Sequence, residues 1–188
     1  MVLRQRTYDI DDLWQLVCDT DDDKHYELIE GEIIEMSPPG GEHGTIAGEI
    51  YHYFRLFDPE RSLGIPTVDT GFYPADDRST LLSPDVAFTR IERAPVRVFK
   101  KWVPLMPDIA VEVQSPGNTQ QQLRRKAAIY LQNGTQLVWI VIPERKVVEV
   151  CRLGADGDIE REFIGQDGAL SGESVLPGFT LDIARLFI

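Results

Sequence analysis

Long apolar runs are missing from this chain of 188 residues, and none approaches the ~18–20 residues that a membrane-spanning helix needs. Cysteine is scarce: Cys18 and Cys151 lie far apart without zinc-type or redox-type spacing, so we expect reduced, packed thiols. The N-terminal stretch has no apolar signal core, and we therefore expect a cytoplasmic protein that does not contact membranes. Repeats and low-complexity linkers are also missing, which favours a single domain over residues 1–188.

Positive charge is in short supply. The 19 Lys and Arg residues face 31 Asp and Glu residues, and this net charge of −12 argues against a protein that coats nucleic acid non-specifically. Residues 61–150 are nevertheless locally basic, with 12 basic and 9 acidic residues. Eight of these basic residues fall in two stretches: Arg90, Arg93, Arg97, Lys100 and Lys101, then Arg124, Arg125 and Lys126. Such runs are often only solvated surface, but we expect any bound nucleic acid to contact these segments.

Apolar spacing and turn residues predict helices interleaved with strands. Helices are expected over residues 7–20, 41–57 and 118–134, the last beginning at Asn118 with Gln121 at the capping-box position. Strands are expected over residues 26–37 (a hairpin turning at Glu30-Gly31), 64–74, 81–89, 107–113, 135–142, 146–153 and 157–164. This order predicts an α/β or α+β sheet with helices packed on it.

The segment PDIAVEVQSP, residues 107–116, is the most informative of these strands. Three of its apolar side chains point to one side of the sheet, whereas Glu112 and Gln114 point to the other. So apolar a run is typical of an interior strand. Because an ionised carboxylate is costly to bury unless it is paired, hydrogen-bonded or bound to a metal, Glu112 is a candidate functional residue.

A second Pro-Asp dipeptide, in SPDVAF, places Asp85 at the start of another apolar strand. If the two strands are neighbours, the Cβ atoms of Asp85 and Glu112 would lie within about 5 Å of each other. Two carboxylates this close raise the pKa of one of them unless a cation lies between them. Mg²⁺ and Mn²⁺ accept such a pair and complete their coordination with water and phosphate oxygens.

Lys126 lies at the edge of the buried face of the helix over residues 118–134, within reach of the strand that precedes it. Asp85, Glu112 and Lys126 together suggest metal-assisted phosphodiester hydrolysis, in which the lysine helps to orient the attacking water. Gln114 shares the face of Glu112 and is a further candidate for contact with water in the site.

From Tyr26 onwards the order of motifs resembles the Uma2 family, restriction-endonuclease-like proteins of the PD-(D/E)XK nuclease superfamily. The segments that carry the resemblance are YELIEGEI, SPPGGEH, SPDVAF, PDIAVEVQSP, RRKAAIYLQNG, LVWIVIP and LPGFTLDIARLF. The resemblance implies an α/β restriction-endonuclease-like core, with a mixed central sheet flanked by helices and extra antiparallel strands. It also implies an Mg²⁺- or Mn²⁺-dependent endonuclease that acts on DNA as a homodimer.

The resemblance also implies residue roles. Asp85 and Glu112 would be the metal-binding acids, and the backbone carbonyl of Val113 would be a further metal contact. The usual lysine position of the superfamily, two residues after the glutamate, is Gln114 here. Members of the Uma2 family carry a lysine on the next helix instead, which matches Lys126.

Two further matches and two departures complete the resemblance. Glu27 matches a recurring glutamate of the family, and His43 matches a histidine at the start of the first core helix. Gln122 and Ile142 stand where many relatives have aspartate. Neither departure removes a metal ligand implied by the resemblance.

Two other classes of function remain open. The net charge and the missing aspartates favour a catalytically inactive nuclease-fold protein that binds nucleic acid or protein. The third class is a hydrolase that uses paired carboxylates without a metal, as glycosidases do. That class leaves Lys126 and the basic surroundings unexplained.

Overall fold

The computed structural model describes residues 7–19, 24–94 and 100–187. Its central sheet has six strands in the order β3-β4-β5-β6-β7-β8. They are β3 (Gly64–Val68), β4 (Val86–Arg90), β5 (Ile109–Val113), β6 (Leu137–Ile142), β7 (Val147–Leu153) and β8 (Ile159–Gly165). Strands β5 and β6 are parallel and the other neighbours antiparallel, so the predicted mixed sheet is confirmed. Arg97 of the first basic stretch lies outside the described residues.

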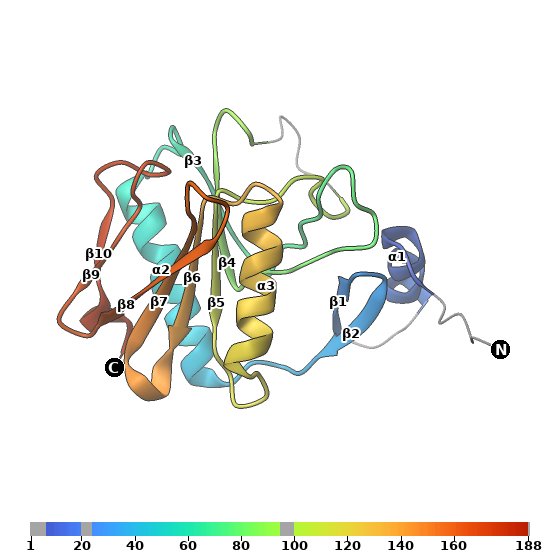
Figure 1. Ribbon diagram of the computed structural model, residues 1–188, viewed down its shortest axis with the longest axis horizontal. Helices are drawn as coiled ribbons and strands as arrows, with labels where there is room; N and C mark the ends of the chain where they lie inside the picture. The colour runs from blue at the N-terminus through green and yellow to red at the C-terminus, as the bar shows by residue number, and fades with distance from the viewer. Residues whose placement is uncertain (1–6, 20–23, 95–99, 188) are drawn as a thin grey trace.

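Helices cover both faces of this sheet (Figure 1). Helix α2 (Gly41–Phe57) lies on one face and α3 (Gln120–Gln132) on the other, while α1 (Ile10–Asp19) lies at the side. The remaining elements are two antiparallel pairs and two 3-10 turns: β1 (His25–Ile29) with β2 (Glu32–Met36), β9 (Ala169–Ser171) with β10 (Thr180–Asp182), η1 (Pro143–Arg145) and η2 (Ile183–Leu186). None of the helices in the described part of the chain is long and apolar enough to cross a membrane.

The core has two layers because β5 and β6 are buried on both faces, as is usual for parallel strands within a sheet. On the α2 side, Ile50 and Phe54 pack with the core that contains Trp139. On the α3 side, Leu123 and Ala127 pack with the core that contains Ala110 and Ile140. The alternation predicted for residues 107–113 is confirmed, because Val111 belongs to the α2 side and Ala110 to the α3 side.

Two predicted strands are shorter than expected. The chain leaves β3 after Val68, where Asp69 has a left-handed backbone with φ 43°. Strand β4 begins only at Val86, since Pro84 has no N–H with which to continue the ladder. Asp85 therefore precedes the strand. Leu81 instead forms an isolated bridge to Leu28 of β1, which attaches the N-terminal hairpin to the core.

The predicted cap of the third helix is wrong by one residue. Thr119, not Asn118, is the N-cap, and it forms a capping box with Gln122 instead of Gln121. Asn118 belongs to the preceding turn, where its N–H donates to the carbonyl of Ser115. Gln122, one of the two departures from the family pattern, is therefore used to begin α3.

The two cysteines and the turn of the β1–β2 hairpin were also predicted from the sequence. Both cysteines are free, as predicted, but only Cys151 is packed, whereas Cys18 is exposed. The hairpin turns at Glu30 and Gly31, which have φ values of 52° and 80°, as a tight two-residue turn requires.

Much of the first basic stretch serves the fold. Asp108 is completely buried just before β5, and its Oδ1 atom accepts hydrogen bonds from Arg90 Nε at 3.1 Å and Arg93 Nη1 at 2.8 Å. This ion pair lies at the opposite end of β5 from Glu112. Arg90 and Arg93 are thus engaged away from the predicted site.

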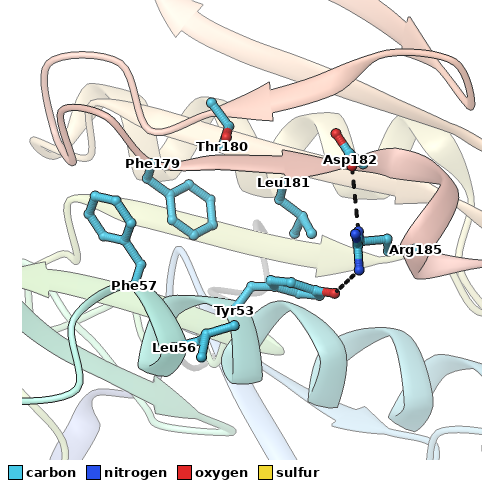
Figure 2. A pocket seen from close by; sticks show the side chains of 8 residues that line it. All are labelled: Tyr53, Leu56, Phe57, Phe179, Thr180, Leu181, Asp182 and Arg185. Atoms are coloured by element: carbon cyan, nitrogen blue, oxygen red, sulfur yellow. Dashed lines mark hydrogen bonds and ion pairs between the residues drawn. The ribbon is translucent and has the colours of Figure 1, made fainter.

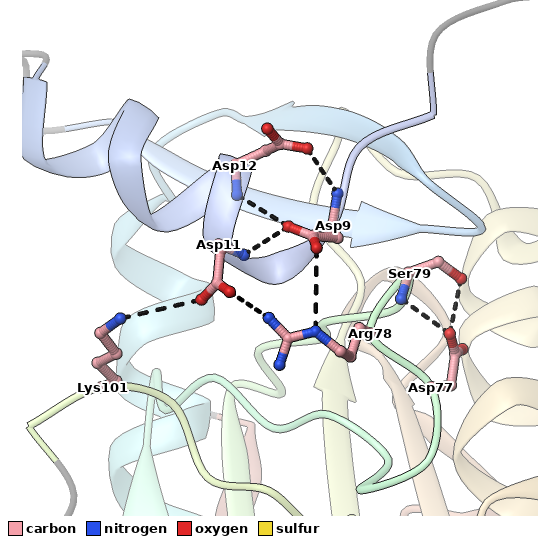
Figure 3. A network of polar contacts seen from close by, with 7 residues as sticks. All are labelled: Asp9, Asp11, Asp12, Asp77, Arg78, Ser79 and Lys101. Carbon is pink, nitrogen blue, oxygen red and sulfur yellow. Dashed lines mark hydrogen bonds and ion pairs between the residues drawn. The ribbon is translucent and has the colours of Figure 1, made fainter.

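A second, exposed network joins α1 to the turn before Leu81 (Figure 3). Arg78 pairs with Asp11, and Lys101 Nζ lies 4.0 Å from the same carboxylate. The side chain of Asp11 is 68% exposed, in contrast to Asp108. Solvent therefore screens this network strongly.

The two ion pairs predict different losses of stability when the aspartate of each is replaced by alanine. Asp108→Ala should lower the free energy of unfolding by about 3–5 kcal/mol, because it leaves two arginines without their buried partner. Asp11→Ala should cost no more than about 1 kcal/mol, because its pair is exposed. Urea unfolding of both variants measures the difference. Equal costs would contradict a structural role for the Asp108 pair.

Candidate active site

Glu112 lies in the middle of a buried polar cluster on the α3 side of the sheet. Its side chain is 3% exposed. One carboxylate oxygen, Oε2, accepts a hydrogen bond from Lys126 Nζ at 2.7 Å, and the other, Oε1, accepts one from the Tyr130 hydroxyl at 2.8 Å. Lys126 and Tyr130 are four residues apart on α3, so both face β5. The carboxylate is therefore fixed by one helix.

Glu27 brings the N-terminal hairpin into the same cluster. Its Oε1 atom lies 2.9 Å from Lys126 Nζ and accepts a hydrogen bond from the backbone N–H of Ser83 at 2.9 Å. The exposed fraction is 3% for Glu27 and 8% for Lys126. The lysine thus lies between two buried carboxylates, and the predicted reach of Lys126 to β5 is confirmed.

Asp85 and His43 form the more open side of the cluster. Asp85 Oδ2 accepts a hydrogen bond from the backbone N–H of Val113 at 2.6 Å and lies 3.0 Å from His43 Nε2. Strands β4 and β5 pair Val86 with Val111, and continuing this register by one residue places Asp85 opposite Glu112. The predicted neighbouring positions of the two acids are therefore confirmed. His43 stands in the first turn of α2.

The electrostatics of the cluster follow from burial and from an excess of carboxylates. Burial raises the pKa of Glu112 to about 8; the charge of Lys126 opposes this shift, and the charges of Asp85 and Glu27 add to it. Burial lowers the pKa of Lys126, but Glu112 and Glu27 outweigh it and hold that pKa above its usual range. The lysine is therefore a permanent cation.

The two remaining polar groups are also shifted. A hydrogen bond to Asp85 raises the pKa of His43 against the effect of its burial, so the imidazole gains a proton more readily than usual. Burial, together with the charges of Glu112 and Glu27, raises the pKa of Tyr130 well above its usual value. The Tyr130 hydroxyl therefore remains a hydrogen-bond donor to Glu112.

The donor set fits a hard divalent cation. Carboxylate oxygens and a backbone carbonyl are the ligands that Mg²⁺ and Mn²⁺ prefer, and each carboxylate oxygen has a second lone pair to offer. Across residues 7–19, 24–94 and 100–187, no three His, Cys, Asp or Glu side chains are arranged to hold one ion together. A cation at Asp85 and Glu112 would therefore need the Val113 carbonyl and water as further ligands.

The structure also shows the surroundings of Gln114, whose predicted contact with water in the site stays a prediction, and of Ile142. The Nε2 atom of Gln114 donates to the carbonyl of Asn118 at 3.1 Å, which fixes the turn before α3. Ile142, the second departure from the family pattern, is buried in the α3-side core. Tyr130 was missed in the sequence, although its spacing of four residues from Lys126 on the apolar face of the helix could have indicated it.

A pocket of about 480 Å³ lies elsewhere, between the end of α2 and the C-terminal segment (Figure 2). Tyr53, Phe57 and Phe179 line it together with Arg185, whose guanidinium donates to the Tyr53 hydroxyl. None of the cluster residues lines this pocket. The chemistry and the pocket are therefore separate, and the carboxylate cluster remains the candidate active site.

Comparison with known proteins found a matching family and a similar solved structure. The sequence model of the Uma2 family, described as "Putative restriction endonuclease", matches residues 10–184. The fold is similar to a crystal structure of "a putative nuclease belonging to DUF820" from Anabaena variabilis ATCC 29413, with a TM-score of 0.79 and 22% identity. The match covers 95% of this chain and 97% of that one, so the fold is shared along almost the entire length. No curated protein matches the chain.

The raised pKa of Glu112 predicts a pH dependence of stability. The folded protein keeps this proton up to a pH of about 8, whereas the ordinary value is 4.5. Between these values the folded state binds more protons than the unfolded state, so the free energy of unfolding falls as the pH rises. Glu112→Gln cannot titrate and should lose less stability over this range in urea unfolding. Parallel curves for the two proteins would contradict the raised pKa.

Proposed function

The chain belongs to the Uma2 family, and we propose that it is an Mg²⁺- or Mn²⁺-dependent endonuclease that hydrolyses phosphodiester bonds in DNA. The observation that carries this proposal is the buried cluster in which Lys126 bridges Glu27 and Glu112 beside Asp85. Three carboxyl groups share one permanent cation, Lys126, and the raised pKa of Glu112 shows that the cluster resists a further negative charge, which a divalent cation would compensate. The descriptions of the family and of the similar protein from Anabaena variabilis both name a nuclease.

Asp85 and Glu112, with the Val113 carbonyl, would hold the cation. When bound, it would neutralise charge on the phosphate and make water a stronger nucleophile. His43 holds the Asp85 carboxylate from the side of α2, while the Val113 N–H holds it from β5. These contacts fix the orientation of Asp85 before any substrate arrives.

Lys126 acts in this proposal as a fixed positive charge and not as a base. Its raised pKa keeps the ammonium group protonated, and two of its three N–H donors point to Glu27 and Glu112. The third donor is available to orient the attacking water or to stabilise negative charge on the phosphate. Glu27 is a positioning residue, since it contacts Lys126 and the Ser83 N–H.

A binding module that does not cleave is the second candidate function. The observation that favours it is the burial of Glu112, whose oxygens both already accept hydrogen bonds. Metal binding and cleavage separate the two candidates. The homodimer implied by the family resemblance stays a prediction; two sites would suit the cutting of both DNA strands.

Calorimetric titration of Mn²⁺ tests the proposed ligands. The wild-type protein should bind Mn²⁺, and Glu112→Gln should bind it at least about 100-fold more weakly, since loss of a ligand costs more than loss of a supporting partner. Asp85→Asn and Glu112→Gln should each abolish Mn²⁺-dependent cleavage of DNA. Equal binding by the wild type and Glu112→Gln would show that another group holds the ion.

Glu149→Gln is the matched control for metal binding. Glu149 is as buried as Glu112 and faces the same side of the sheet, but it pairs with Arg124. Its loss should leave Mn²⁺ affinity unchanged. Wild-type protein that binds Mn²⁺ but cleaves no DNA would favour the binding module.

Tyr130→Phe tests the hydroxyl that holds Glu112. The ring is fully buried and is kept in this variant, while the hydrogen bond to Glu112 Oε1 is lost. Mn²⁺ affinity should fall about 10–100-fold, the usual effect of losing a partner that orients a metal ligand. Tyr53→Phe, which removes a hydroxyl bonded to Arg185 instead, should have no effect on Mn²⁺ affinity. Equal affinities in all three proteins would show that Lys126 alone orients Glu112.

A further inference from the structure

One row of residues crosses the sheet from the candidate active site to its edge. Glu112 of β5 pairs with Ile140 of β6, Ile140 pairs with Glu149 of β7, and Glu149 pairs with Phe163 of β8. Directly paired residues share a face, so all four side chains lie on the α3 side of the sheet. Three strand spacings separate Glu112 from Phe163, a distance of about 14 Å.

Cations gather at the far end of this row. Arg124 of α3 binds Glu149 through Nε and Nη2 at 2.9–3.1 Å, and Arg161 Nε of β8 lies 3.5 Å from the same carboxylate. The guanidinium of Arg145 in η1 lies over the Phe163 ring, 5.3 Å from its centroid. These contacts hold three arginines from three elements on one face, and Lys146 follows directly in the chain.

These groups are accessible, unlike the acid beneath them. Arg124 is 37% exposed, Arg161 40% and Phe163 48%, whereas Glu149 is 1% exposed. Arg145 and Lys146 are exposed as well. We define the basic face as Arg124, Arg145, Arg161 and Phe163, and we include Lys146 because it is exposed and follows Arg145 in the same turn. Its four cations outnumber Glu149 and the neighbouring Glu144, so it is locally positive on a protein with a net charge of −12.

The basic face also approaches the candidate active site at one end of the strands. Because β5 and β6 are parallel, the η1 turn after β6 lies at the same end of the sheet as Val113, the last residue of β5. Asp85 contacts the Val113 N–H at this end. A strand bound at Arg145 and Lys146 would therefore pass the carboxylate cluster within a few phosphates, since one strand carries a phosphate about every 3.4 Å along the helix axis.

We infer that the basic face binds the phosphate backbone of the DNA whose scissile bond reaches Asp85 and Glu112. This inference rests on the proposed function, because it names the surface that delivers the substrate to that site. Arginine and lysine side chains bind phosphate oxygens directly. The Phe163 ring pre-orients Arg145 through a cation–π contact and so reduces the entropy lost on binding.

Fluorescence anisotropy with a labelled DNA duplex, in buffer without divalent cations, tests the inference without cleavage. The variant is Arg145→Gln with Lys146→Gln, because neither side chain pairs with a carboxylate within the described part of the chain. Its affinity should fall about tenfold or more, and the salt dependence of binding should weaken by about 1.8 in log–log slope for two lost phosphate contacts.

The control removes the same charge elsewhere. Arg61→Gln with Arg185→Gln alters two exposed cations that lie outside the basic face and outside both basic stretches, and it should change affinity less than about twofold. A loss confined to the Arg145 and Lys146 variant supports the inference, whether or not the wild type cleaves DNA. Equal affinities for both double variants would overturn the inference and leave the proposed function standing. Wild-type protein that binds no duplex would overturn the inference, and Mn²⁺-dependent cleavage tests the proposed function separately.

Discussion

The ammonium group of Lys126, held between Glu27 and Glu112, is the contact on which the rest of this structure depends. The three charges come from α3, β1 and β5, and all are nearly sealed from water. In so apolar a setting, removing Lys126 leaves two buried carboxylates without a compensating charge, which is far more costly than the loss of a surface pair. The cluster therefore joins the hairpin, the sheet and the helix while it assembles the candidate active site. The side chains proposed to carry the chemistry are therefore the same ones that hold these elements together.

The carboxylates of the cluster have hydrogen-bond donors, but their negative charge is not fully balanced. Main-chain N–H groups of Ser83 and Val113 and the Tyr130 hydroxyl each donate to a carboxylate, so the oxygens have partners. Neutral donors orient a carboxylate and lower the cost of its burial, but they do not cancel its charge. Burial raises the pKa of Glu112, and the remaining negative charge of Asp85 and Glu27 raises it further. A proton on Glu112 relieves that charge below a pH of about 8, and the proposed divalent cation would relieve it when the proton leaves.

The sequence predicted local features better than pairings between distant segments. Glu112 could be singled out because a carboxylate interrupts an apolar run, and Asp85 because it begins a neighbouring strand. Helical periodicity placed Lys126, and the same wheel could have placed Tyr130, one turn further on the same face. The cap of α3 was misplaced by one residue because Asn118 and Thr119 are both good caps and only the preceding turn decides between them. The burial of Asp108 against Arg90 and Arg93 could not be foreseen, since it depends on how the end of β4 meets the start of β5.

That last contact also changes how the charge of the molecule relates to its binding surfaces. Arg90 and Arg93 look available in the sequence but neutralise an internal acid, whereas the basic face combines α3, η1 and β8, including Arg161 from the acidic segment over residues 151–188. Screening limits exposed charges to a range of about 8 Å at physiological salt, so the local surface governs contact with DNA more than the net charge does. The acidic remainder still repels a polyanion on approach. An acidic protein with one basic face can therefore restrict the orientation in which DNA binds, with the strand directed towards the site and away from every other surface.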